Sequence, residues 1–149
     1  MPSTLRTGHV GLNVTDLDRS LVFYADVLGF QVLGEGKEGE SRYAFLGQDG
    51  TLVLTLWQQA DGAYDRALAG LHHLAFQVDA IEDVKAAEEQ LRSHGADFAH
   101  DGVVAHHEGA SSGGIFFHDP DGTRLEIYAP AGAEEAPAPS ATAPTCGFF

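Results

Sequence analysis

The sequence predicts an α+β fold in which two βαβββ modules form one domain over residues 1–130. A short apolar pattern that begins with histidine occurs twice, from His9 to Val14 and from His73 to Val78, at an offset of 73 − 9 = 64 residues. A capping residue and a segment of helical periodicity follow each copy. The tripeptide Asp49–Thr51 also recurs, as residues 121–123. These repeats indicate duplication of one supersecondary unit, with a site where the two copies meet.

The first module covers approximately residues 6–66. The segment from Gly8 to Val14 alternates as a strand does, and Thr15 is expected to cap the following helix. That helix carries apolar residues at helical spacing and ends at Gly29. Three strands are expected after it, separated by glycine-rich turns, near residues 31–34, 42–47 and 51–57.

The second module covers approximately residues 71–130 and repeats this order. A strand from Leu71 to Val78 leads to Asp79 and Glu82, which have the spacing of a capping box, and a helix is expected over about residues 80–94. Strands are expected near residues 98–105, 113–118 and 123–129. Asp119-Pro120-Asp121-Gly122 joins the last two strands and has the residue order of a type I turn.

Residues 131–149 form a tail rich in alanine and proline, without periodicity, and are expected to be disordered or extended. The last residues, from Cys146 to Phe149, are more apolar than a solvated tail requires. Docking of this end on the domain, or on a neighbouring subunit, is therefore an open alternative.

The composition narrows the functional class. Eight basic residues against 22 acidic ones give a net charge of -14, which repels phosphate backbones and anionic lipid surfaces. No apolar run approaches the roughly 20 residues of a membrane span. A single cysteine, Cys146, excludes a disulfide framework and a paired-cysteine zinc motif. We expect a cytoplasmic protein with a small-molecule partner and no nucleic-acid or membrane partner.

The strand pattern separates the two adjacent histidines of the second module. Alternation places His73 with Ala75 and Gln77 on one face, opposite the apolar face that packs under the helix. His72 falls on the apolar face and is expected to be structural or exposed. His73 is therefore the ligand candidate, and His9 has the equivalent position in the first module.

Glu126 lies mid-strand between Leu125 and Ile127, where an unpaired carboxylate would be costly to bury. Two imidazoles and one carboxylate form the ligand set of a facial triad, which leaves open positions on the metal. We therefore predict that His9, His73 and Glu126 bind a divalent ion. Imidazole and carboxylate suit several metals, so Fe, Mn, Zn, Ni and Co all remain candidates.

These residues make the chain resemble the vicinal oxygen chelate superfamily, which includes glyoxalase I, bleomycin-resistance proteins, fosfomycin-resistance enzymes, methylmalonyl-CoA epimerase and extradiol dioxygenases. The resemblance covers roughly residues 6–130. It rests on the His9 strand, on Leu17–Phe30 with Phe23-Tyr24 and Leu28-Gly29-Phe30, on Leu71–Phe76, and on the turn that leads to Glu126.

The resemblance implies a cup-shaped sheet around a divalent metal and a homodimer. The metal site then lies within one chain or is shared, with His9 facing the partner subunit's His73 and Glu126. It also implies chelation of a small-molecule substrate by the metal, which acts as a Lewis acid or as an oxygen-activating centre.

Departures from subfamily patterns favour some reactions over others. Matching the two Asp-Gly-Thr tripeptides puts Leu54 opposite Glu126, and leucine cannot bind metal. The four-ligand pattern of glyoxalase I and the epimerase is therefore disfavoured, whereas three ligands resemble extradiol dioxygenases and fosfomycin-modifying transferases. Dioxygenases also need an acid or base, for which we assign His118 and His107, with His106 as a further candidate.

The leading hypothesis is a metal-dependent small-molecule enzyme, with extradiol-type dioxygenase chemistry favoured over lyase or transferase chemistry. An alternative is a metal-free drug-binding protein of the bleomycin-resistance type, whose acidic surface attracts cationic ligands. A third is a module with a degenerate site that serves as a subunit or regulator.

Overall fold

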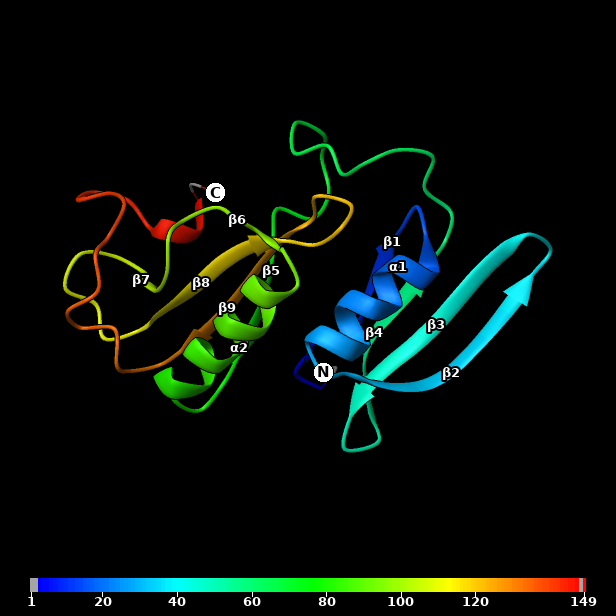
Figure 1. Ribbon diagram of the computed structural model, residues 1–149, viewed down its shortest axis with the longest axis horizontal. Helices are drawn as coiled ribbons and strands as arrows, with labels where there is room; N and C mark the ends of the chain where they lie inside the picture. Colours follow the sequence, from blue (N-terminus) through cyan, green and yellow to red (C-terminus); the bar gives the residue numbers. More distant parts are fainter. Residues whose placement is uncertain (1–2, 148) are drawn as a thin grey trace. The chain divides into compact units, whose positions relative to one another are not determined.

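The computed structural model describes residues 3–147 and 149. The chain divides into two compact units, Met1–Ala63 and Tyr64–Phe149. Each unit contains its own mixed sheet and one helical segment against it (Figure 1). The predicted α+β class and the duplication are confirmed, because the two sheets have equivalent strand orders.

The sheet of the first unit has the order β1-β4-β3-β2. Strand β1 (Val10–Asn13) runs parallel to β4 (Thr51–Trp57), and β3 (Ser41–Gln48) is antiparallel to both β4 and β2 (Gln31–Glu38). All four strands lie where the sequence predicts them, although β2 and β3 form a longer hairpin. Alternation holds in β1, since Leu12 is buried whereas Gly11 and Asn13 are exposed.

The helix of the first unit differs from the prediction at its start. Asp16, not Thr15, is the N-cap of α1 (Leu17–Leu21), because an Asp16 carboxylate oxygen accepts the Arg19 N–H at 3.2 Å. The Thr15 hydroxyl instead accepts a bond from the Arg19 guanidinium at 2.9 Å. The segment continues as a π-helical turn, η1 (Val22–Val27), and turns away at Gly29, whose φ of 85° favours glycine.

The sheet of the second unit has the order β5-β9-β8-β6. Strand β5 (Leu74–Gln77) is parallel to β9 (Arg124–Ala129), which pairs antiparallel with β8 (Gly113–His118). The single strand expected over 98–105 is two short ones, β6 (Asp97–Phe98) and β7 (Val104–Ala105), both paired with β8. The residues between them form turns and bends.

Helix α2 (Ile81–Ser93) packs against β8 and β9 (Figure 1). It buries Ile81, Val84 and Leu91 at helical spacing, as its amphipathic pattern predicts. The expected capping box is wrong: Ala80 is the N-cap and makes no side-chain capping bond. Buried apolar side chains rather than a cap therefore fix the start of this helix.

The turn between β8 and β9 follows the sequence prediction. The Gly122 N–H donates to the Asp119 carbonyl at 3.0 Å, which closes the turn. One Asp119 carboxylate oxygen also accepts the N–H groups of Asp121 and Thr123, both at 2.9 Å. Because Asp119 is 5% exposed, these bonds are shielded from water. The turn sets where β9, and with it Glu126, begins.

The tail, expected to be disordered or extended, is irregular and is bonded to the domain. The Ala105 N–H donates to the Pro137 carbonyl at 2.9 Å, and the Thr145 N–H donates to the His106 carbonyl at 2.8 Å. Thr145 is fully buried, and its hydroxyl donates to the Ala105 carbonyl at 2.5 Å. The short 3-10 helix η2 (Thr145–Gly147) follows. Docking of this end on the domain is confirmed for the described residues.

The helices of residues 3–147 and 149 are all too short or too polar to cross a membrane.

Candidate metal-binding site

Glu126 lies at the centre of one face of the second sheet. The strand register puts Ala75 on β5 and Phe116 on β8 directly beside it. Residues paired across neighbouring strands share a face, so this face also carries Gln77, Tyr128 and His118. The opposite face carries Leu125 and Ile127, both buried. The predicted division of β9 into an apolar face and a ligand face is therefore observed.

The Glu126 side chain is almost fully buried, with 2% of the residue exposed. Its two carboxylate oxygens lie near different histidines: Oε2 forms a hydrogen bond with His106 Nε2, and Oε1 lies 3.8 Å from His73 Nε2. A buried carboxylate without partners would be strongly destabilising. Two imidazole nitrogens beside one carboxylate meet this requirement, and they also place ligand-capable atoms together.

His73 directly precedes β5 and is half-buried. Burial lowers the pKa of its imidazole from 6.5, and the nearby charges of His72 and Arg124 lower it further. The Glu126 carboxylate opposes this shift. At neutral pH His73 is therefore uncharged, which is the form that binds metal.

A chain of hydrogen bonds determines which nitrogen of His73 carries the proton. Arg124 Nη1 lies 3.1 Å from His72 Nε2, and a guanidinium can only donate, so this His72 nitrogen accepts. The His72 Nδ1–H then donates to His73 Nδ1 at 2.8 Å. The proton of neutral His73 is consequently on Nε2, the atom nearest Glu126. A metal ion at Nε2 would require the other neutral tautomer, with the proton on Nδ1.

His106, a further acid or base candidate from the sequence, contacts Glu126, and the sequence did not predict this contact. Its Nδ1 lies 2.7 Å from the Ser112 hydroxyl, and its ring packs edge-on against Tyr128 with centroids 5.0 Å apart. It follows β7, in an irregular stretch where strand alternation gives no orientation. The pairing of β7 with β8 continues to residue 106, whose N–H donates to the Ser112 carbonyl at 3.0 Å, just before β8 begins. No sequence signal marked this placement.

The two histidines predicted as acid or base occupy different settings. His118 ends β8 on the Glu126 face, and its Nδ1 lies 2.9 Å from an Asp97 carboxylate oxygen. His107 is exposed, with its Nδ1 3.3 Å from the Glu108 carbonyl oxygen. Their catalytic roles stay predictions.

His9 is exposed within the first unit and directly precedes β1, as His73 directly precedes β5. In each unit the strand that follows the histidine pairs in parallel with the last strand of its module. The convergence of His9 with His73 and Glu126 stays a prediction. Among the described residues, no three His, Cys, Asp or Glu side chains are grouped as a complete metal site. Two of the three predicted ligands, His73 and Glu126, lie close together in the second unit, and their role as ligands stays a prediction.

The expected match between Leu54 and Glu126 is wrong by one residue. Gly11 corresponds to Ala75 at the offset of 64, and it pairs with Thr55, whereas Ala75 pairs with Glu126. A bulge in the pairing of β3 with β4, where Leu46 faces Leu54 but Gly47 faces Leu52, adds the extra residue. Thr55 offers neither imidazole nor carboxylate, so the absence of a fourth strong ligand at this position stands.

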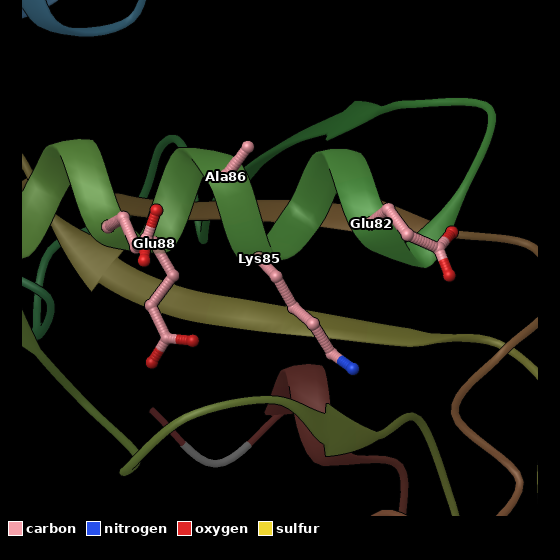
Figure 2. A pocket seen from close by; sticks show the side chains of 5 residues that line it. Glu82, Lys85, Ala86 and Glu88 are labelled. Atoms are coloured by element: carbon pink, nitrogen blue, oxygen red, sulfur yellow. The ribbon is translucent and has the colours of Figure 1, made fainter.

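A surface hollow of about 440 Å³ lies elsewhere in the second unit, along α2. Figure 2 shows Glu82, Lys85 and Glu88 extending from this helix, and Ala86 and Glu89 complete the lining. Acidic and basic side chains of a single helix surround it, and it contains none of the predicted metal ligands. The hollow is therefore separate from the Glu126 face.

Comparison with known protein families gives a match to the Glyoxalase/Bleomycin resistance protein/Dioxygenase superfamily over residues 6–127. A solved glyoxylase/bleomycin resistance protein/dioxygenase domain from Frankia sp. EAN1pec superposes with a TM-score of 0.74 at 28% identity, covering 85% of this chain and 93% of that one. The match includes both units.

Two curated relatives have different activities. Catechol-2,3-dioxygenase of Bacillus subtilis is 33% identical over 82% of this chain, which spans 40% of that protein's length. Lactoylglutathione lyase of Haemophilus influenzae is 35% identical over 80% of this chain, which spans 88% of the lyase. Both relatives are named as enzymes, and they differ in reaction.

Proposed function

Because the chain belongs to the glyoxalase/bleomycin resistance protein/dioxygenase superfamily, we propose that it is a metal-dependent enzyme that acts on a small molecule by extradiol-type dioxygenase chemistry. One observation carries the metal dependence: Glu126 is 2% exposed, at the centre of a sheet face, with imidazole nitrogens beside both of its oxygens. In a core site without a ligand function, an apolar residue would cost less to bury.

The proposed ligands are His73 Nε2, a Glu126 carboxylate oxygen and His9. The bound ion would supply Lewis-acid or oxygen-activating chemistry and keep open positions for the substrate. Fe, Mn, Zn, Ni and Co remain the candidate ions. Loading is expected to shift the proton of neutral His73 from Nε2 to Nδ1, which frees Nε2 for the ion. Metal affinity should fall as the pH decreases, because protonation of the imidazole competes with the ion.

His106 is the proposed second partner of Glu126. The Glu126 carboxylate at its Nε2 and the Ser112 hydroxyl at its Nδ1 together fix the orientation of the His106 imidazole. When a metal occupies one carboxylate oxygen, His106 holds the other. His118 and His107 remain candidates for proton transfer at the edge of the site.

Three ligands favour a dioxygenase over a lyase. Thr55 stands where a fourth ligand would come from the first module, and the catechol-2,3-dioxygenase relative is 33% identical. Lyase chemistry is the second candidate, because the chain spans 88% of the lactoylglutathione lyase it matches. A homodimer is proposed with either reaction, and the metal site then lies within one chain or between two.

The direct test is the metal content of protein purified without oxygen or chelator, measured by elemental mass spectrometry. About one iron or manganese per chain supports the proposal and leads to assays of catechols with oxygen. Zinc, nickel or cobalt would move the proposal toward the lyase. No metal, and none taken up on reconstitution, would overturn it and favour metal-free drug binding.

A further inference from the structure

The aromatic ring of Phe149 lies on the Glu126 face of the second unit. Its centroid is 5.5 Å from that of His73, with the rings tilted by 35°, and 4.9 Å from that of Phe116, edge-on. The His118 ring is 6.2 Å away, and the Arg124 guanidinium lies 5.8 Å from the Phe149 centroid. A residue 76 positions after His73 in sequence thus covers the imidazole proposed as a ligand (149 − 73).

The segment that carries Phe149 has a firm anchor and a weakly held end. Thr145 is fully buried and bonded to the backbone of residues 105 and 106. Gly147, after it, is exposed. Phe149 is half-buried, and Arg66 Nη1 reaches its backbone oxygen at a long 3.4 Å. The ring can therefore leave while the Thr145 anchor remains in place.

The same segment brings Cys146 within electrostatic reach of the site. Burial and the Glu126 carboxylate both raise the pKa of the Cys146 thiol, so it stays protonated at neutral pH. The segment thus has a buried anchor beside β7 at Thr145, a thiol influenced by the Glu126 charge, and an aromatic ring on the Glu126 face. A fully solvated tail would have none of these interactions.

We propose that Phe149 is an intramolecular plug: its ring docks on His73 and Phe116, shields the His73 imidazole, and must swing out before a ligand reaches that face. The docking surface is aromatic, flanked by the cationic Arg124, and its occupant is the ring of Phe149 from the chain's own tail. The autoinhibitory effect rests on the proposed metal function, whereas the docking itself does not.

The test is the rate at which diethyl pyrocarbonate modifies His73 in the metal-free protein of residues 1–149 at pH 7, measured by peptide mass spectrometry. Phe149→Ala should raise this rate about fivefold, which corresponds to about 1 kcal/mol of docking free energy. Exposed His94 serves as the internal reference, and Thr142→Ala, an exposed change in the same tail, is the matched control. Phe149→Tyr should restore protection. An equal rate in wild type and Phe149→Ala would overturn the plug.

A second readout separates this proposal from the proposed function. Cobalt(II) capture by the metal-free protein should be faster in Phe149→Ala than in wild type or Thr142→Ala. If His73 becomes reactive in Phe149→Ala but no variant binds cobalt, the docking holds and the metal function fails. If cobalt binds at the same rate in all three proteins, the autoinhibitory effect is refuted while the metal function stands.

Discussion

The turn before β9 offers a quantitative test, because one carboxylate holds its shape. Replacing Asp119 with alanine removes the acceptor of two backbone N–H groups, those of Asp121 and Thr123, each bonded at 2.9 Å. Both donor residues are 5% exposed, so water cannot readily replace the lost acceptor. The substitution therefore leaves two buried donors without this partner.

The expected loss follows from the number and kind of bonds. A hydrogen bond to a charged group contributes roughly 1.5–3 kcal/mol, and some relaxation of the turn reduces the sum. We expect Asp119→Ala to lower the free energy of unfolding by about 3 kcal/mol. For a chain of this length that corresponds to a decrease in Tm of roughly 6–12 °C.

Urea unfolding followed by far-UV circular dichroism measures this loss. The matched control is Asp119→Asn, which keeps one side-chain oxygen as an acceptor and should lose less than half as much. A loss in the free energy of unfolding of less than about 0.5 kcal/mol in Asp119→Ala, the size typical of a neutral surface substitution, would contradict the role assigned to the Asp119 carboxylate. Equal losses in the alanine and asparagine variants would show that charge, not the acceptor, maintains the turn.

Two further predictions concern the same unit. Gly114→Ala should prevent β8 from pairing with β9, because the added Cβ would lie 1.9 Å from the Ile127 carbonyl oxygen. A Cβ at Gly34 meets nothing within 4 Å, so the control Gly34→Ala should fold normally as judged by circular dichroism. A folded Gly114→Ala protein would contradict the strand register. Burial lowers the pKa of His73 from 6.5, so below about that pH the unfolded chain binds a proton that the folded chain does not. Stability should fall as the pH falls through this window, and His73→Gln should reduce the loss measured by urea midpoints at pH 7 and 5.5; an unchanged pH dependence would exclude His73 as its source.

Strand positions could be predicted because alternation reports directly on burial. In β9, Leu125 and Ile127 are buried on one face while Glu126 lies on the other, as two-residue periodicity requires. The repeated strand pattern that begins with His9 and with His73 likewise placed His73 just before β5. Such patterns depend only on which face of a sheet meets the core.

Local hydrogen-bond competition was harder to predict. Asp16 and Thr15 both can cap a helix, and the choice of Asp16 depends on the Arg19 backbone and side chain. The Leu54 match failed for a related reason: a bulge inserts one residue into β4, and no local sequence signal marked it. A shift of one residue moves a side chain to the other face.

The sequence patterns did not predict the long-range contacts of irregular segments. His106 reaches Glu126 from a stretch without periodicity, and Phe149 reaches His73 from the tail. Their positions depend on tertiary packing, chiefly the buried Thr145 that ties the tail to β7. Composition predicted a disordered or extended tail because it records average hydrophobicity, whereas a few buried groups determine docking.

The proposed metal-dependent function requires that His9, His73 and Glu126 bind one ion together. Cobalt(II) titration of the metal-free protein, followed by visible absorption, tests it most directly. We expect one cobalt per chain in wild type and in His94→Ala, which is a control at an exposed histidine. Stoichiometric binding should be lost in His9→Ala, His73→Ala and Glu126→Gln. Retention of one tightly bound cobalt per chain in His9→Ala or Glu126→Gln would contradict it.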